Sequence, residues 1–273
     1  MAGLRELKRH LKSIDTVGHV AGAMRSASSA KYAKLNRITR EYRVYAESCE
    51  DAYALFPETE EAANPDAPEL CLLIASNRGL SGGYNNELFA FAETLPPANR
   101  VWIAVGKKAI AYCREKQIET AGEYVFPDIP KIGDVRPLFD ALYGGYRNGT
   151  YSSVKLIYPK FRNAAVQIPQ ELRFLPPERK ENGGGDVQTL ILPDSEETRE
   201  RIEEMTLCAG FFGHILEAAL GAQAAMMMAM RAAYDNAVES GDALRIAISR
   251  ERQRVITASV IETASGNRKE DNA

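Results

Sequence analysis

The chain has 273 residues, of which 45% are hydrophobic and 26% charged, and its formal net charge is −3. These values fit an ordinary soluble protein rather than a disordered one, and no apolar run approaches the roughly 18–20 residues that a membrane span needs. The N-terminus lacks the apolar core of a secretory signal, and the four cysteines are far apart without metal-ligand spacing. The sequence therefore predicts a cytosolic protein with free thiols.

The positions of the prolines divide the chain into three parts. All thirteen lie between Pro57 and Pro193, and a proline in a helix interior costs about 3 kcal/mol. The proline-free arms, residues 1–56 and 195–273, can therefore form helices far longer than the average of about 11–12 residues. We expect the arms to pair as an antiparallel coiled coil, the alternative being two separate amphipathic helices on a globular core.

Apolar residues in the first arm follow the spacing of three and four that a coiled coil needs. The pattern begins at Leu4, Leu7, Leu11 and Ile14. It resumes after a skip at Val17, Ala21 and Met24. A skip of this kind disturbs supercoiling locally, so we expect an irregular coil at that point.

The middle of the chain, residues 68–193, alternates strand and helix patterns. The apolar run "LCLLIAS" precedes one helical pattern, and "RVWIAVG" precedes another, "KKAIAYCREKQ". Strands that alternate with helices indicate a mainly parallel sheet covered on both faces. The sequence therefore predicts a small Rossmann-like α/β domain, with the polar run "ERKENGGGDVQ" as a surface loop.

The stretch "SNRGLSGGYNNE", residues 76–87, joins a predicted strand to a predicted helix, as phosphate-binding turns do. It lacks the Lys-Ser/Thr of a P-loop and the G-x-G-x-x-G spacing of a dinucleotide turn. We therefore interpret its glycines as conformational, allowing positive φ and close packing, and expect no bound nucleotide and no cofactor.

The last arm carries nine apolar or small residues at coiled-coil spacing. They are Met205, Cys208, Phe212, Ile215, Ala219, Ala222, Met226, Ala229 and Ala233. A single partner helix cannot cover every apolar residue of such an arm. We therefore expect Phe211, Phe212, Met226 and Met230 to be exposed when the chain is alone.

Basic residues dominate the first forty positions. They are Arg5, Lys8, Arg9, Lys12, Arg25, Lys31, Lys34, Arg37 and Arg40, against Glu6 and Asp15. A basic helix suits an acidic protein surface or a nucleic acid. The arms have few aromatics and no stacking pattern, and the pI is about 5.8, which argues against nucleic acid.

Three motifs resemble the gamma subunit of F-type ATP synthases. "GAQAAMMMAMRAAYDNA" with "SRERQRVITASVIETASGN" resembles that family's C-terminal helix, and "LKSIDTVGHVAGAMRSASSAKY" resembles its N-terminal helix. The turn "SNRGLSGGYN" stands where the family has an Asp-Arg-Gly-Leu-Cys-Gly-Gly-Tyr-Asn-like turn. The resemblance covers nearly the whole chain, in order.

The resemblance implies a rotor shaft that couples ion flow through the membrane to ATP synthesis or hydrolysis, without a catalytic residue, nucleotide, metal or small-molecule substrate of its own. It implies the alpha and beta subunits, the epsilon subunit and the c-subunit ring as partners, and a peripheral place on the cytoplasmic face of the inner membrane. Contacts with the beta subunit are expected from Arg252, Gln253, Thr257, Met24 and Arg25. Contacts of the base-domain turn are expected from Arg78, Gly79, Gly82, Gly83 and Tyr84.

The chain departs from the family pattern at several polar positions. Where the family has lysines in the N-terminal helix, this chain has His19 and Gly22. In the C-terminal helix, Gly221, Ala222 and Met226 stand in place of a Ser-Glu pair and an arginine, and Arg231 and Ser259 stand in place of acidic residues. The aspartate of the turn is replaced by Asn77. Several polar contacts with the head are therefore expected to be missing or reversed, as in a diverged or second rotary complex.

Two other classes of protein stay open. One is a stand-alone coiled-coil adaptor. The other is an α/β enzyme that would have to use Arg78, Tyr84, Asn85 and Glu87, although no histidine lies near that turn and no nucleophile–base pair is evident.

Overall fold

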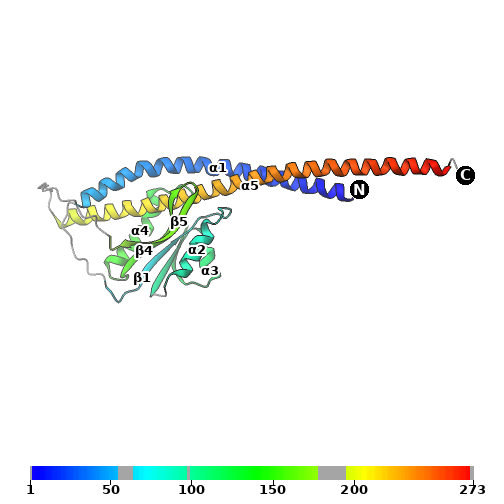
Figure 1. The fold of residues 1–273 in the computed structure, drawn as a ribbon. Coiled ribbons are helices and arrows are strands. Elements are labelled where there is room, and N and C mark those ends of the chain that lie inside the picture. The colour runs from blue at the N-terminus through cyan, green and yellow to red at the C-terminus, as the bar shows by residue number, and fades with distance from the viewer. Residues whose placement is uncertain (1, 55–63, 97–98, 178–194, 271–273) are drawn as a thin grey trace. The chain divides into compact units, whose positions relative to one another are not determined.

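The computed structural model describes residues 2–54, 64–96, 99–177 and 195–270. The described residues form ten elements in chain order, and Figure 1 shows their arrangement along the chain. They are α1 (Ala2–Tyr53), β1 (Glu69–Ile74), α2 (Tyr84–Thr94), β2 (Arg100–Val105), α3 (Lys107–Glu115), β3 (Thr120–Tyr124), α4 (Ile132–Arg147), β4 (Ser153–Asn163), β5 (Val166–Leu175) and α5 (Glu196–Glu270). The loop "ERKENGGGDVQ" lies outside the described residues.

The chain forms two compact units, and the long helices α1 and α5 contribute to both. The first unit, the coil unit, contains residues 1–27 and 229–273. The second, the sheet unit, contains residues 28–228. The long proline-free helices predicted for both arms are confirmed, at 52 residues for α1 and 75 for α5.

The sheet unit is built on a five-stranded sheet in the order β3-β2-β1-β4-β5. The first four of these strands are parallel, and β5 runs antiparallel to β4 as the second strand of a hairpin. Alternate residues of β1 enter different cores: Leu70 and Leu72 pack with α4 and α5, whereas Cys71 and Leu73 pack with α2 and α3. The predicted, mainly parallel sheet with both faces covered is therefore confirmed.

The expected exposure of apolar residues on α5 is wrong. Phe211 is 0% exposed, Phe212 5% and Met226 5%. The ring of Phe211 lies 5.5 Å from that of Phe174 in β5, and Phe212 meets Tyr42 of α1 edge-on at 4.9 Å. Within the sheet unit α5 is covered by α1 and by the sheet, so it buries residues all round. Met230, in the coil unit, is also buried.

In the coil unit α1 and α5 pair antiparallel, as predicted. Asp15 bonds Arg245 at 3.0 Å, and a Cβ added to Gly18 would lie 3.4 Å from that of Ala237. The expected skip at Val17 is wrong, because Val17 is 53% exposed whereas Gly18 is buried. The seam therefore continues in steps of three and four, with glycine at the close approach of the helices.

The expectation that no segment is apolar enough to span a membrane is corrected by helix α5. Between Glu196 and Ile261 it contains a window that meets the length and composition of a span. Most of that window is buried inside the protein, and the core helices of soluble proteins meet the same criterion. The finding is therefore weak support for a span.

Candidate functional site

The turn after β1 is held by hydrogen bonds within the chain. The amide nitrogen of Ser76 donates to Asn85 Oδ1 at 3.1 Å, and Asn85 Nδ2 donates to the hydroxyls of Ser76 and Ser81 at 2.8 and 3.2 Å. The Ser76 hydroxyl donates to the Arg78 carbonyl oxygen at 2.6 Å. Asn85 is buried and its amide is engaged in these contacts, so it shapes the turn and is poorly placed for catalysis.

The backbone of this turn explains only some of its glycines. Gly82 has a φ of +59°, which favours glycine, whereas Gly83 has an ordinary φ of −76°. Gly79 has no positive φ among those recorded. Leu80, which the sequence analysis did not single out, has a φ of +63° and is 63% exposed.

A second glycine-dependent contact lies after β2. Gly106 has a φ of +94°, and a Cβ there would lie 2.2 Å from the carbonyl oxygen of Ala75. Only glycine allows the start of α3 to approach the end of β1 so closely.

Arg78 of the turn lies at an ion cluster that includes α1. Lys31 Nζ is 2.5 Å and Arg78 Nη2 3.7 Å from Asp128 Oδ2. Burial acts to raise the pKa of Asp128, but the hydrogen bond and charge of Lys31, with the charge of Arg78, outweigh it and lower the pKa. The Arg78 side chain is 60% exposed, so it remains open to a partner.

Tyr84 faces α5 of the same chain. It is 5% exposed, its hydroxyl donates to the Ala218 carbonyl oxygen at 2.9 Å, and burial raises its pKa. A Cβ on Gly221 would lie 3.4 Å from the Tyr84 ring, so Gly221 gives the tyrosine room beside α5. The partner contacts expected of this turn as a whole stay predictions.

Asn77, where the resembling family has aspartate, has a local structural reason. Its amide nitrogen donates to the Phe126 carbonyl oxygen at 2.7 Å, and its oxygen accepts from the Lys107 amide at 3.3 Å. An ionised aspartate has no donor for the first of these bonds.

A second cluster that the sequence analysis missed joins β4 to α5. The Tyr158 hydroxyl lies 3.0 Å from His214 Nδ1 and 3.0 Å from Glu217 Oε2. Burial acts to raise the pKa of Glu217, but the hydrogen bonds from His214 and Tyr158 outweigh it and lower the pKa. Periodicity could not reveal this cluster, because Tyr158 and His214 are 56 positions apart.

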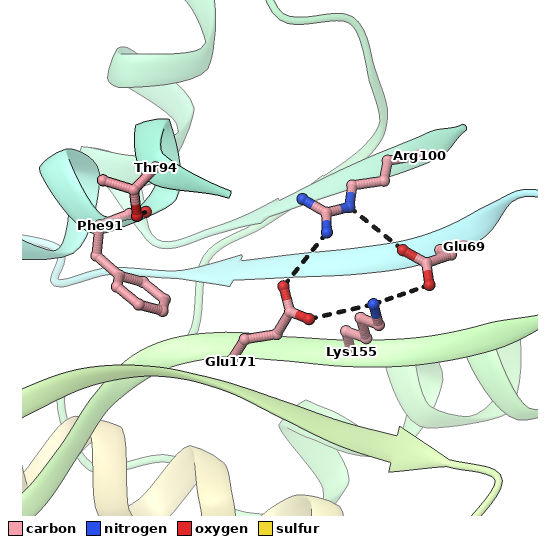
Figure 2. A network of polar contacts seen from close by, with 6 residues as sticks. All are labelled: Glu69, Phe91, Thr94, Arg100, Lys155 and Glu171. Carbon is pink, nitrogen blue, oxygen red and sulfur yellow. Dashed lines mark hydrogen bonds and ion pairs between the residues drawn. The ribbon is translucent and has the colours of Figure 1, made fainter. Parts of the chain in front are cut away.

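Figure 2 shows a third cluster, a ring of four charged side chains on the sheet. Arg100 bonds Glu69 at 3.3 Å and Glu171 at 3.4 Å, and Lys155 bonds the same two carboxylates at 2.8 and 3.1 Å. The ring braces four neighbouring strands, β2, β1, β4 and β5. Since each charge is paired within the ring, it is suited to holding the sheet together rather than to binding an ion.

In the coil unit, Arg25 and Met24 lie beside the seam. The Arg25 guanidinium carbon is 4.7 Å from the ring centroid of Tyr234, a cation–π contact. The same ring occupies the space beside Gly22, where a Cβ would lie 3.3 Å from it. The glycine in place of a family lysine therefore accommodates Tyr234.

Arg252, Gln253 and Thr257 are exposed on α5. The Thr257 hydroxyl donates to the Gln253 carbonyl oxygen at 3.0 Å. At about 1.5 Å per residue, Arg252 lies roughly 27 Å along the helix from Tyr234. The structure therefore brings Arg252, Gln253 and Thr257 together, whereas Met24 and Arg25 lie at a different height along the coil, near Tyr234.

No group of His, Cys, Asp and Glu suited to a metal occurs among the described residues. The cavity at the ends of β1 and β2 measures about 60 Å³, against roughly 300–1,000 Å³ for an ordinary ligand pocket. This cavity is too small for a nucleotide, whereas a more open hollow of about 330 Å³ lies beside the same turn, lined by Asn77, Arg78, Lys107 and residues 125–128.

Comparison with known proteins confirms the family resemblance. A family model described as ATP synthase matches residues 3–268. The ATP synthase gamma chain of Rubrobacter xylanophilus is 31% identical over 284 residues, covering 97% of this chain and 98% of the relative. That of Moorella thermoacetica is 31% identical over 281 residues, with 97% and 98% covered.

Solved structures share the fold. The rotor of the Euglena gracilis mitochondrial ATP synthase in rotational state 1 matches with a TM-score of 0.69 at 17% identity, covering 93% of this chain and 99% of that chain. A chain of the same organism's OSCP/F1/c-ring structure matches with a TM-score of 0.71 at 15% identity, covering 97% and 93%. The family model and the two bacterial relatives carry the assignment: this chain belongs to the ATP synthase gamma family, the central-stalk rotor subunits of F-type ATP synthases.

Proposed function

We propose that this gamma chain couples ion flow to ATP synthesis or hydrolysis by rotating inside an alpha–beta head, with no catalytic group of its own. The carrying observation is the match to gamma chains over 97% of the sequence, which includes both long helices and the sheet. Residues 1–56 and 195–273 would be the shaft, and residues 68–193 the base that meets the epsilon subunit and the c-subunit ring.

The non-catalytic role is supported by how the polar groups of the turn are used. Asn85 and Asn77 hold backbone atoms, and Tyr84 holds α5. The work left to the chain is mechanical, since an asymmetric shaft contacts chemically identical beta subunits differently and so biases their conformations. We place the complex on the membrane with this chain peripheral, on the cytoplasmic face.

Arg252 and Gln253 are the proposed contact with the beta subunit on α5. Both side chains are exposed, and neither has a recorded side-chain hydrogen bond within the described residues. Arginine offers a planar fork that can hold a carboxylate through two hydrogen bonds, and glutamine adds a donor and an acceptor. Thr257, one turn later, with Met24 and Arg25 at another level, would complete the beta-subunit contacts.

Rotation itself is the test. All four cysteines, Cys49, Cys71, Cys113 and Cys208, are buried. A Glu119→Cys variant would therefore carry the one readily labelled thiol, and a bead can be attached there. With the chain assembled on its alpha and beta subunits, ATP should drive rotation of the bead in one direction.

Three other outcomes contradict the proposal. Stable binding to a different protein without the alpha–beta head would indicate an adaptor. Chemistry on a nucleotide by the chain alone would indicate an enzyme. A head that binds the chain and hydrolyses ATP while the bead stays still would remove the rotary role.

A further inference from the structure

A small cavity lies in the sheet unit where the parallel strands β1 and β2 end. Its walls are the segments that follow β1, β2 and β3, together with one side of α5 from Ile215 to Met226. The strand order reverses between β1 and β4, and doubly wound sheets bind their ligands in the crevice at such a point. In this chain the cavity lies beside that point, at the ends of β1, β2 and β3, where α5 leaves a space of about 60 Å³.

Gln223 of α5 supplies a buried acceptor in the cavity wall. Gln223 lines the cavity and is 7% exposed, and its Oε1 has no hydrogen-bond partner among the described residues. A buried amide oxygen without a partner is destabilising, because it has lost its bonds with water. An occupant of the cavity therefore has to donate a hydrogen bond.

Of the other polar side chains of the wall, Arg78 is 60% exposed, whereas Asn77 and Asp128 are engaged. Asn77 holds Phe126 and Lys107 through both ends of its amide. Asp128 is held by Lys31 and Arg78. With two cations around one carboxylate, the wall does not favour a further cation, and the amide oxygen of Gln223 does not favour an anion.

The size of the cavity also fits a small neutral occupant that can donate a hydrogen bond. In this measure a water molecule needs about 10–15 Å³ and two to four polar neighbours. A space of about 60 Å³ meets the first requirement. Ser76 and Arg78 belong to the cavity wall, and the carbonyl oxygen of each accepts one hydrogen bond within the described residues and keeps a second lone pair.

We propose that this cavity is a hydration site, in which ordered water donates to Gln223 Oε1 and bridges α5 to the turn at residues 76–78. Two departures from the family pattern, Ala222 and Met226, line the same cavity, and the short side chain of Ala222 helps to leave room for the water. In this arrangement the water fills the space between the turn at residues 76–78 and α5, and it links the turn to α5 through Gln223. This inference does not depend on rotation.

A high-resolution structure of the full chain, alone or in its complex, tests the site directly. We expect an ordered water within about 2.7–3.2 Å of Gln223 Oε1, and loss of that water in Gln223→Met, which keeps the length of the side chain. Gln167→Leu is the matched control, since its amide bonds protein atoms, the carbonyl oxygens of Asn163 and Ala164. A dry cavity in the wild-type structure overturns the proposal.

Hydrogen exchange tests the bridge. The amides of Asn77 and Arg78 should exchange at least three-fold faster in Gln223→Met than in the wild type, and at the wild-type rate in Gln167→Leu. Unchanged exchange in Gln223→Met would show that the water does not link the turn to α5. Equal acceleration in both variants would trace the effect to a general loosening and would also contradict the proposal.

Discussion

The hydroxyl of Tyr84 donates a hydrogen bond to the carbonyl oxygen of Ala218, 134 positions later in the chain, at 2.9 Å. Tyr84 ends the glycine-rich turn and begins α2, so this bond ties the turn to α5. Gly221 lies beside this contact, and a Cβ there would lie 3.4 Å from the tyrosine ring, at the lower limit of ordinary van der Waals contact.

Two glycines of α5 are therefore expected to respond differently to alanine. A Cβ on Gly213 meets no atom within 4 Å, so Gly213→Ala should stabilise the helix by about 0.5–1 kcal/mol. A Cβ on Gly221 would lie 3.3 Å from Gln167 Cγ and 3.4 Å from the Tyr84 ring. Gly221→Ala should therefore give a smaller gain or a loss. Urea unfolding of both variants provides the comparison, and equal stabilisation would show that Tyr84 does not need this space.

The four-charge ring of Figure 2 predicts acid sensitivity. Burial acts to raise the pKa of Glu69, but hydrogen bonds from Lys155 and Arg100 outweigh it and hold the pKa below its usual range. A lowered carboxyl pKa stabilises the fold above the unfolded-state value of about 4.3, and this stabilisation is lost as the pH falls through the folded-state pKa.

Glu69→Gln should therefore destabilise the protein at pH 7, and the difference from wild type should shrink as the pH falls below about 4. Urea midpoints measured between pH 7 and pH 3 give this profile. Glu119→Gln, at an exposed carboxylate, is the control and should follow the wild type throughout. A Glu69→Gln deficit that stays constant with pH would mean that the ring acts through packing and not through charge.

Replacing Arg252 and Gln253 together by leucine tests the proposed beta-subunit contact. Both side chains are exposed, so helix content should not change, whereas coupled ATP turnover in the reconstituted complex should fall at least several-fold. The matched change at Arg250 and Arg254 should have less effect, since Arg254 bonds Glu251 of its own helix at 2.9 Å. Wild-type turnover in the first variant would remove this contact from the proposal and leave the rotor assignment standing.

The isolated chain is expected to self-associate through the coil unit. Ile256, Val260 and Ile261 are 54%, 62% and 60% exposed, and exposed apolar groups promote association. Changing all three to glutamine, a good helix former, should shift the sedimentation profile toward monomer. The same change at Val44, Ile132 and Val166 of the sheet unit should shift it less. A wild-type chain that is monomeric with a sharp cooperative melt would contradict dependence on a surrounding head.

The sequence by itself determined the helices, the sheet and the family. Proline is absent from both arms and is unfavourable in helix interiors, even though α4 contains Pro137, so the long helices could be predicted without any contact. Apolar runs alternating with helical patterns indicate parallel strands for a similarly local reason. The missing Lys-Ser/Thr argued against a phosphate site in the turn, because that chemistry depends on residue types at fixed spacing.

Only the tertiary structure decided which side chains are covered and what they bond. The sequence pattern assigned Val17 to the seam, but Gly18 occupies that position in the structure, because the helices approach closely there. Phe211 is buried because the sheet packs on the side of α5 that the coiled-coil pattern left open. Tyr84 turns inward because a carbonyl oxygen of α5 is within its reach. Periodicity is a property of neighbouring residues, whereas burial and pairing depend on elements that lie far apart in the chain and meet only when the chain has folded.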